Sequence, residues 1–556
     1  MEYNQTSFSG GMNLLVDDTR LADNEYRVGF NIRNRFDVLD GVKTATEEYA
    51  PNGVKQGLYT FGDYLLLFVS GIAYYRNKSE TGWHEIVGFA MSSAVPRLYV
   101  CAVPVSTTQD GRTLNATGSN TAPIITVPKT SDVSVAGSPS GVVVQDGINQ
   151  PFFIWVDDNS NVLCRTVQKY SEWKYDPTGA DDRREYVPVG TFMEWYDGIL
   201  FVVSADGSTL YRSVTGRPLD FVINIDINGD KAGDATTTSY SVGIGGITAL
   251  KTLNTDGLMV SAQNRYCYVV STNRSPNATS LFGEPTFIRR YLFDSGCINE
   301  KCIVDILGDF AFVDPEGLRS FNAVQQLLFE GRNSIFSLKI ASLFKGIIQD
   351  GIITSAISYD NYALFSLNTV YGYRIVVYDT LNKCYVGLDD QTGGVAITQF
   401  AKIDTQTTEL YCITANNKFL RLYNGTKYAT SLCRLKAACS QNPKVELQLT
   451  DFRCVLNNFR QASSVTCSVL VNNRLSGTPI TKFVAYKDPT QSLDTWFDDM
   501  DSMLSNLFFN WTGANQGWKM SFVIEWTGGG SVTNVQATAT EQTPLNPLLS
   551  QTKTPQ

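Results

Sequence analysis

The feature that most constrains the fold is a unit of four short strands that recurs along the chain. In residues 57–86, GLYTFGDYLLLFVSGIAYYRNKSETGWHEI, turns containing glycine separate four runs, and the second run is the most apolar. The same scheme returns in residues 192–222, 247–270, 302–321, 356–387 and 397–425. A unit whose second strand is covered on both faces by neighbouring units is typical of a propeller blade.

These units predict an all-β fold built around a β-propeller in residues 51–429. The spacing between units is uneven, so we predict six to eight irregular blades. An array of β-sandwiches is the competing arrangement of such strands. Around the propeller we expect an N-terminal arm with a ring-closing strand in residues 1–50, an additional C-terminal β module in residues 430–540 and an extended tail in residues 541–556.

Two stretches interrupt the pattern inside the propeller. Residues 91–150 are rich in Ser, Thr, Val, Gly and Pro, which predicts an irregular blade or an inserted β segment. In residues 320–349, Ile335, Leu338 and Phe344 recur near helical spacing. We therefore expect one or two short helices there.

The charge balance argues against a surface that grips nucleic acid. The net charge is −9 and the isoelectric point is about 5.0. Sequence-independent DNA binding needs clustered Lys and Arg side chains that displace phosphate counterions. The densest basic positions here are two isolated pairs, Arg183-Arg184 and Arg289-Arg290.

The cysteines and the N-terminal residues bear on where the chain is made. The eleven cysteines include no CxxC pair, and their odd number and irregular spacing predict reduced, mostly buried thiols. The first residues lack the basic and apolar regions of a signal peptide. No apolar run approaches the roughly 18 residues that span a bilayer. We expect a soluble protein made in the cytoplasm.

Catalytic chemistry has few candidates in this sequence. His84 is the single histidine, so any Ser-His-Asp or Cys-His arrangement would have to use it. It lies in GWHEI, which reads as an outer blade strand, and we interpret it as a structural or surface residue. Carboxylate pairs of the kind that glycosidases use occur in the chain, but each lies in a predicted solvated turn. These pairs are Asp157-Asp158, Asp181-Asp182, Asp389-Asp390 and Asp498-Asp499. We predict that the protein is not an enzyme.

One loop has the spacing of a calcium site. In DINGDKAGD, residues 226–234, oxygen-bearing side chains stand at positions 1, 3, 5 and 9, as in loops that wrap around Ca²⁺. These residues are Asp226, Asn228, Asp230 and Asp234. Lys231 occupies the position where such loops have glycine, so we favour a plain polar turn and keep calcium as the alternative. No other metal or cofactor is expected.

The opening stretch, FSGGMNLLVDDTRLADNEYRVGFNIR, is too polar for a signal peptide and too broken by Gly and Asp for a helix. Gly10-Gly11 permit a tight turn, and the residues from Tyr26 to Ile32 alternate as a strand. We expect that strand to complete a blade and close the ring, which would remove an open sheet edge. Residues 1–12 would then be left to contact a neighbouring subunit.

Three segments together resemble one protein family, the tail-nozzle proteins of short-tailed (podovirus-type) bacteriophages, also called tail tubular protein B or packaged-DNA stabilisation proteins. Residues 8–42 resemble the start of these proteins. The matching positions are Phe8, Gly10, Gly11, Asn13, Leu21, Asn24, Glu25, Asn31, Arg33 and Gly41. LYRSVTGRPLDF, residues 210–221, resembles their recurring blade edge, and SGCINEKCIVDILGDFAFVDPEGLRSF, residues 295–321, resembles a Gly-Cys blade start with its closing Gly-Leu-Arg-Ser-Phe.

The resemblance spans roughly residues 8–430 and implies a structural virion protein. Members of this family form a homohexameric nozzle of propeller-containing subunits below the portal and its tail adaptor protein. The nozzle retains packaged double-stranded DNA and conducts the genome during ejection. The implied partners are other copies of the chain, the adaptor, tail fibres or spikes, DNA that passes without sequence-specific binding, and the host cell envelope. The implied location is the virion tail, after assembly in the host cytoplasm.

A second function class remains open. A tail-associated propeller that binds or degrades carbohydrate would also be a large β scaffold. It would need two carboxylates and stacking aromatic rings that converge in one cleft, and no local motif in the sequence requires such a cleft.

Overall fold

A computed structural model describes most of the chain. The described residues are 2–103, 113–115, 124–126, 141–156, 160–167, 187–213, 218–219, 221, 239–241, 246–253, 257–262, 267–274, 285–293, 296–321, 336–344, 354–404, 407–440, 445–457, 459–484, 505–509 and 516–542. Nearly all regular structure among them is β, as predicted.

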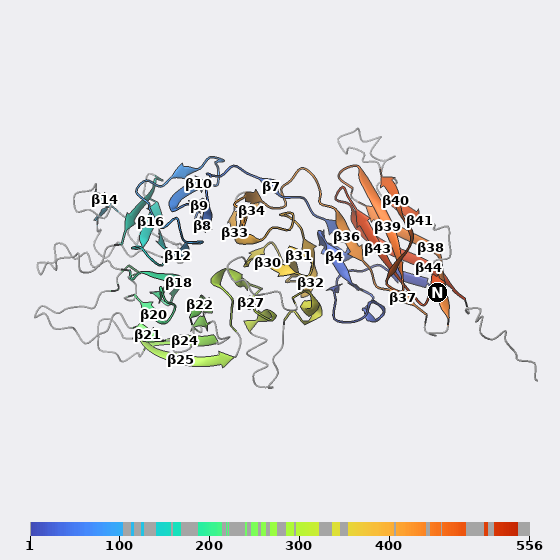
Figure 1. The fold of residues 1–556 in the computed structure, drawn as a ribbon, viewed down its shortest axis with the longest axis horizontal. Helices are drawn as coiled ribbons and strands as arrows, with labels where there is room; N and C mark the ends of the chain where they lie inside the picture. The colour runs from blue at the N-terminus through green and yellow to red at the C-terminus, as the bar shows by residue number, and fades with distance from the viewer. Residues whose placement is uncertain are drawn as a thin grey trace, which may run out of the picture.

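The sheets of residues 46–421 are arranged as a β-propeller, which confirms the predicted all-β propeller (Figure 1). Five of them are four-stranded. They are β8–β11 (Lys55–Phe61, Tyr64–Val69, Ile72–Asn77, His84–Glu85), β12 with β15–β17 (Tyr99–Val103, Gly141–Gln145, Phe152–Val156, Val162–Thr166), β18–β21 (Gly190–Tyr196, Ile199–Ser204, Thr209–Arg212, Ser239–Ser241), β22–β25 (Ile247–Leu253, Gly257–Ala262, Cys267–Arg274, Pro285–Phe293) and β33–β35 with β7 (Ile397–Asp404, Thr408–Thr414, Phe419–Arg421, Thr46–Glu47).

Two further groups of strands lie along the chain between the fourth and the fifth of these sheets. One is three-stranded: β26 (Ile303–Asp305), β27 (Phe310–Asp314) and β28 (Gly317–Ser320). The other is the meander β29–β32, which belongs to a ten-stranded sheet. Its strands are Ser355–Tyr359, Tyr362–Thr369, Gly372–Asp379 and Cys384–Asp389. The predicted count of six to eight blades is not confirmed, because five sheets have the four-stranded blade form.

Each repeated unit of the sequence forms one of these sheets, and in three of them the second strand is buried along almost its whole length. All six residues of β19 and of β23 are buried, as are five of the six residues of β9. A run of consecutive apolar residues satisfies such a position because sheets cover both faces of the strand. The propeller pattern in the sequence thus arises from the burial of its second strands.

The ring closes with a different N-terminal strand from the one we predicted. β7, Thr46–Glu47, is the outer strand of the sheet that ends with β35, where Leu420 pairs with Glu47. A strand from before the first blade therefore completes the last one. The expected closing strand, from Tyr26 to Ile32, is divided into short pieces, and the left-handed φ of 53° at Asn31 makes the break before Ile32.

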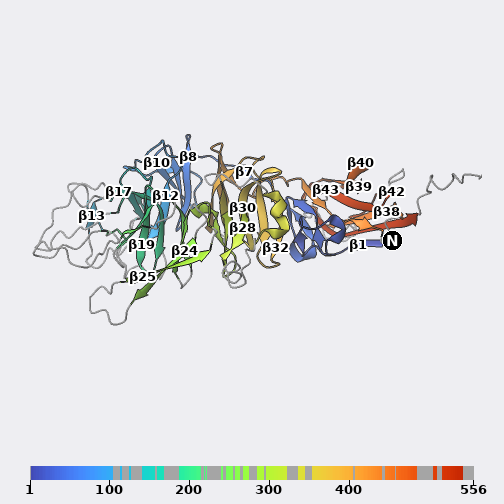
Figure 2. The ribbon, with the colours of Figure 1, turned by 60° about the horizontal axis from the view of Figure 1, so that its bottom comes forward.

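Most of residues 11–41 lie between the ring and the sheets at the other end of the molecule, whereas the N-terminus lies at that far end (Figures 1 and 2). β4 (Val28–Phe30) pairs with β32 of the propeller on one side and with β36 (Ser431–Arg434) on the other. β1 (Glu2–Gln5) pairs with β44 (Ser531–Gln542). Gln5, Phe8 and Met12 are buried within their own chain, so residues 1–12 are not left over as a whole, while their contact with a neighbouring subunit stays a prediction.

Two sheets form the end opposite the ring, and we call them the terminal sheets. One continues the ten-stranded sheet through β36, β43 (Lys519–Trp526), β39 (Ser463–Val471) and β40 (Arg474–Val484), with β37 (Ala438–Cys439) beside β43. The other is seven-stranded and contains β38 (Glu446–Asn457), β44, β41 (Ser505–Phe509), β42 (Gln516–Gly517), β1, β5 (Ile32–Arg33) and β6 (Leu39–Gly41). β2 (Gly11–Met12) and β3 (Glu25–Tyr26) form a separate parallel pair.

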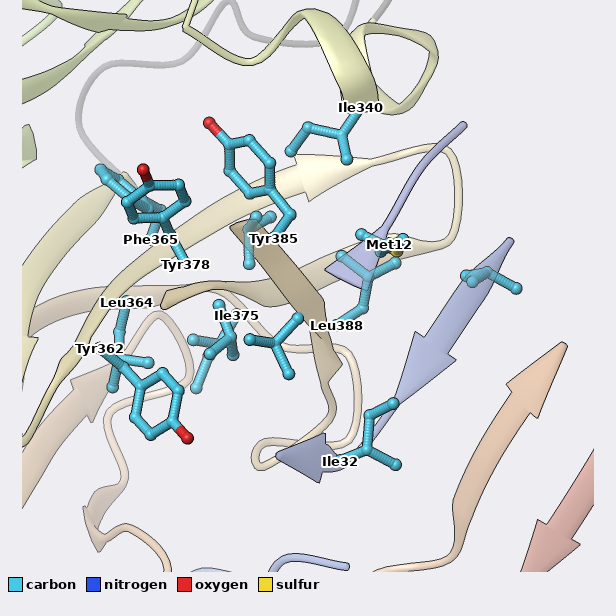
Figure 3. Close-up of a cluster of buried hydrophobic side chains, with 14 of the residues drawn as sticks. Met12, Ile32, Ile340, Tyr362, Leu364, Phe365, Ile375, Tyr378, Tyr385 and Leu388 are labelled. Carbon is cyan, nitrogen blue, oxygen red and sulfur yellow. The ribbon is translucent and has the colours of Figure 1, made fainter. Parts of the chain in front are cut away.

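One apolar core runs from the propeller into the terminal sheets. It joins Val313 and Phe365 of the propeller to Phe452 and Trp526 of the terminal sheets. In Figure 3, Met12 and Ile32 from the N-terminal strands lie beside Leu388 and Ile375 of the meander β29–β32. The two ends of the molecule therefore share buried side chains through the N-terminal strands.

The interrupted stretches are accounted for in part. The segment of residues 91–150 supplies the first two strands of a blade, β12 and β15, and the hairpin β13–β14 (Thr113–Asn115, Ile124–Thr126) lies between them in the chain. A 3-10 helix at Leu338–Leu343 lies in the predicted helical stretch, whereas Ile335 is outside the described residues. The other short 3-10 helices are η1 (Asp18–Arg20), η2 (Arg35–Asp37) and η4 (Glu300–Cys302).

Candidate functional site

A pocket lies at the centre of the propeller, where the first strands of successive sheets face one another. It has a volume of about 190 Å³ and is lined by residues of β8, β12, β18, β29 and β33, together with η4. The lining residues are Tyr59, Tyr99, Val100, Phe192, Met193, Glu300, Lys301, Ser355, Ala356, Gln399 and Phe400. We call it the axial pocket. Polar and aromatic side chains from separate blades converge there, as they do in ligand sites.

Glu300, which lines the axial pocket, is held in an ion pair. Arg97, which precedes β12, donates to both carboxylate oxygens of Glu300 at 3.3 and 3.2 Å. The guanidinium lies 4.7 Å from the ring centroid of Tyr99 and 5.1 Å from that of Phe192. Stacking on two rings fixes the planar Arg97 group and leaves the Glu300 charge neutralised.

Lys301 follows Glu300 on the same 3-10 turn and has no such partner. Asn299 begins the turn, and its side chain accepts a hydrogen bond from the Lys301 backbone N–H at 2.8 Å. Within the described residues, no hydrogen bond or ion pair reaches the Lys301 ammonium group. Burial and the nearby Arg97 charge lower the pKa of Lys301 to about 8, although Glu300 opposes the shift.

The neutral polar groups of the pocket are held by neighbouring backbone. The Tyr59 hydroxyl donates to the Leu98 carbonyl at 2.8 Å, and Gln399 Oε1 accepts from the Leu58 N–H at 3.1 Å. Burial raises the pKa of Tyr59 well above its usual value. Ser355 adds a hydroxyl from the start of β29. The pocket therefore presents one unpaired cation, fixed polar groups and aromatic walls.

This arrangement suits binding better than acid–base catalysis. Among the described residues that line the pocket, Glu300 is the one carboxylate, and it is held by Arg97. A glycosidase needs two carboxyl groups on either side of the scissile bond. The axial pocket does not bring such a pair together.

The residues singled out from the sequence lie elsewhere. Asp226, Asn228, Asp230 and Asp234 of the calcium-like loop are outside the described residues. The described residues contain no group of three or more His, Cys, Asp or Glu side chains that could hold a metal ion. His84 lies on the outermost strand of its blade, as expected, where it is exposed and 3.1 Å from Glu80.

One predicted solvated acid is instead deeply buried. Asp389, at the end of β32, accepts hydrogen bonds from Arg33 Nη1 at 3.1 Å and from Nη2 at 2.7 Å. The Tyr423 hydroxyl donates to the same carboxylate at 2.7 Å. The interpretation of Asp389 as a turn acid is wrong, because the chain places Arg33 opposite it from 356 residues away. Its neighbour Asp390 is also described, whereas the other three acid pairs are outside the described residues.

A second cluster consists of the residues that carry the family resemblance at the N-terminus. Phe8 is fully buried, and a Cβ on Gly11, at φ 73°, would lie 2.4 Å from the Tyr385 carbonyl. Asn13 donates to Glu25 at 3.0 Å, and Asn31 donates to the Thr430 carbonyl at 2.8 Å. With Arg33, these residues form the contact between the ring and the terminal sheets, which we call the joint. The predicted tight turn at Gly10-Gly11 is present, closed by a bond from the Gly11 N–H to the Phe8 carbonyl.

The axial pocket was missed from the sequence because its residues are scattered. Arg97 precedes β12, whereas Glu300 and Lys301 share the turn before β26, and no short motif connects the two places. One usable signal exists: Asn299-Glu300-Lys301 caps a turn just before a blade, which brings its charged side chains to the inner end of that blade.

The described cysteines agree with the expectation of reduced thiols. Ten of them have free thiols, and nine of these are buried. Among the described residues, no helix is both long enough and apolar enough to cross a membrane.

Comparisons with known proteins give no family for this chain. No family model matches it, and no curated protein matches it. Among solved structures, the chain is similar to Raptor of Chaetomium thermophilum, at a TM-score of 0.36 and 8% sequence identity. That alignment covers 68% of this chain and spans 29% of the Raptor chain.

Proposed function

We propose that this chain is the tail-nozzle protein of a short-tailed bacteriophage. It is a non-enzymatic, structural virion protein that assembles as a homohexamer below the tail adaptor. It retains packaged double-stranded DNA and provides the conduit for genome ejection into the host. Its location is the virion tail, and its further partners are tail fibres or spikes and the host envelope.

The observation that carries this proposal is the position of the residues that resemble the nozzle family. The N-terminal ones are concentrated in the joint, where Phe8, Asn13, Glu25, Asn31 and Arg33 are buried. Residues that resemble the nozzle family and also form one buried contact support the proposal more strongly than matching residues scattered over the surface would. Here these residues fix the orientation of the propeller relative to the terminal sheets.

A fixed relation suits a subunit of a conduit that contains DNA under pressure. Arg33 and Asp389 are held by two parallel hydrogen bonds, and Arg33 also lies 5.0 Å from the Tyr423 ring centroid. Paired guanidinium–carboxylate bonds are directional, so they fix orientation as well as distance. The second link is Lys519, whose ammonium is 3.0 Å from both carboxylate oxygens of Asp17.

In this proposal, the conduit lies between copies of the chain and not along the propeller axis. The axial pocket has a volume of about 190 Å³ and side-chain walls. The major groove of DNA alone is about 12 Å wide, so a duplex does not pass through it. The net charge of −9 also suits a conduit, because phosphates slide past acidic or neutral walls and are held by basic ones.

We also propose that the propeller has seven blades, counting the three-stranded sheet and the meander β29–β32 with the five four-stranded sheets. The first strands support this order, because β33 contacts β8, β12 contacts both β8 and β18, and β18 contacts β22. β29 contacts both β26 and β33, and the turn η4 before β26 contacts β22. These contacts complete one closed circuit.

Imaging tests the nozzle proposal. We expect the purified chain, alone or mixed with its adaptor protein, to form six-fold rings in negative-stain micrographs. Virions assembled without the chain should lose their DNA. Monomers alone, both free and on adaptor-bearing particles, would contradict the proposal. Cleavage of host-envelope polysaccharide that is abolished by one carboxylate substitution would favour the carbohydrate-degrading alternative.

A further inference from the structure

The axial pocket contains an uncompensated charge. The charged residues that line it are Glu300 and Lys301, and Arg97 neutralises Glu300 at 3.2 Å. The Lys301 ammonium is left without a counter-ion among the described residues. A partly buried cation without a partner costs free energy, and this cost is relieved either by loss of the proton or by capture of an anion.

The charge and walls of the pocket define the class of anion. One cation matches a single negative charge, which favours a carboxylate over a doubly charged phosphate. Four aromatic side chains line the same space, from Tyr59, Tyr99, Phe192 and Phe400. Such walls suit the apolar part of a ligand, and Ser355 also lines the pocket.

We propose that the axial pocket is a binding site for a small organic monocarboxylate, which pairs with Lys301 and places its apolar part against the aromatic walls. The site is independent of the nozzle function. The volume of about 190 Å³ and the four aromatic side chains of the lining make small carboxylates such as propionate and benzoate suitable probes.

The affinity should depend on pH in a defined direction. With its pKa lowered to about 8, Lys301 is protonated at pH 7 and mostly neutral at pH 9. The other groups that shift around it move away from this range: the Glu300 carboxylate raises the pKa of Arg97 although burial opposes this, and burial raises the pKa of the Cys302 thiol to about 11 and that of Tyr59 further. Because only the protonated amine binds the anion, affinity should fall roughly tenfold from pH 7 to pH 9.

The test is calorimetric titration of the full chain with benzoate and propionate, with benzyl alcohol and inorganic phosphate as comparison compounds. We expect the carboxylates to bind the wild-type chain and the control Lys78→Met, whose lysine is an exposed partner of Asp63. In Lys301→Met the affinity should fall at least tenfold. Equal binding by Lys301→Met, or equal binding of benzyl alcohol, would overturn the proposal, as would phosphate binding that exceeds that of benzoate.

A second measurement on the unmodified chain serves if Lys301→Met fails to fold. Amines react with acetic anhydride only as the free base, and mass spectrometry reports the rate for each lysine. Lys301 should be acetylated at pH 8. Saturating benzoate should lower the acetylation rate of Lys301 several-fold and leave that of Lys78 unchanged. An unchanged rate at Lys301, or no carboxylate binding by the wild-type chain, would overturn the proposal.

Discussion

The propeller ring and the joint are held together in opposite ways. In the ring, separate apolar clusters fill the spaces between neighbouring sheets, and each strand pairs mainly with the next strand in the chain. Around the joint, residues 2–41 contact residues 384–434 and 519–535. The buried charged groups that meet there are hundreds of residues apart in the chain. The ring is thus built from repeated local contacts and the joint from single long-range ones.

This difference indicates which part of the molecule tolerates change. A ring cluster that loses one methyl group is still supported by the equivalent clusters between other sheets. The joint has no second copy of Arg33 or Phe8. We therefore expect substitutions in the joint to affect the ring and the terminal sheets together, since one core spans both.

The largest effect is expected from deletion of residues 1–33. This removes the fully buried side chains of Phe8, Met12, Tyr26 and Ile32. Truncating one such residue costs about 2–5 kcal/mol, and a whole domain is stable by about 5–15 kcal/mol. Circular dichroism should show a chain without cooperative unfolding. A deletion protein that melts cooperatively with an intact ring would show that the ring does not depend on the joint.

The next largest effect is expected from Arg33→Met, which leaves Asp389 buried without its cation. Removing one partner of a buried pair costs about 3–5 kcal/mol. Urea unfolding should show this decrease in the free energy of unfolding. The matched control is Arg35→Met, because Arg35 pairs with Asp360 where both side chains are more than 40% exposed. A surface pair contributes at most about 1 kcal/mol. Equal losses for the two variants would contradict the assignment of Arg33 to the joint.

A smaller effect is expected where β7 closes the ring. Arg76 is 4% exposed, donates to Glu48 at 2.8 Å and lies against the Tyr411 and Phe419 rings. Glu48→Ala leaves that guanidinium without its carboxylate, which costs about 1–3 kcal/mol. The neighbouring Glu47→Ala is the control, since its partner Lys418 is half exposed. The melting temperatures of the two variants provide the comparison. A larger decrease for Glu47→Ala than for Glu48→Ala would contradict closure through Glu48.

The smallest effect is a pH dependence at Asp17. Burial opposes ionisation, but the hydrogen bonds from Thr19 and Lys519 together outweigh it and lower the pKa of Asp17 to about 2. A carboxyl whose pKa is lowered by folding stabilises the protein above its unfolded value, near pH 4, and this contribution is lost as pH falls towards 2. Asp17→Asn should therefore lower the melting temperature at pH 6 and change it less at pH 2.5. An equal change at both pH values would exclude this linkage.

The sequence predicted the ring well and the joint poorly, for a physical reason. A blade is formed by about thirty consecutive residues. A short stretch of sequence therefore contains its alternating runs, its glycine turns and an apolar second strand such as Leu65–Val69. The joint depends on pairs such as Arg33 with Asp389, which are adjacent only after folding. The interrupted strand around Asn31 was likewise hidden, because its left-handed φ is imposed by bonds to Thr430 and Asp390.

Native-state hydrogen exchange tests the central claim most directly, by comparing the ring strand β30 with the terminal strand β43. The claim is that the joint makes one cooperative body of the two regions. Their slowest amides should then exchange with the same opening free energy in the wild-type chain, and Arg33→Met should lower both by the same amount. If β43 exchanges at a lower opening free energy than β30, and Arg33→Met changes one region alone, the two regions are independent and the claim is wrong.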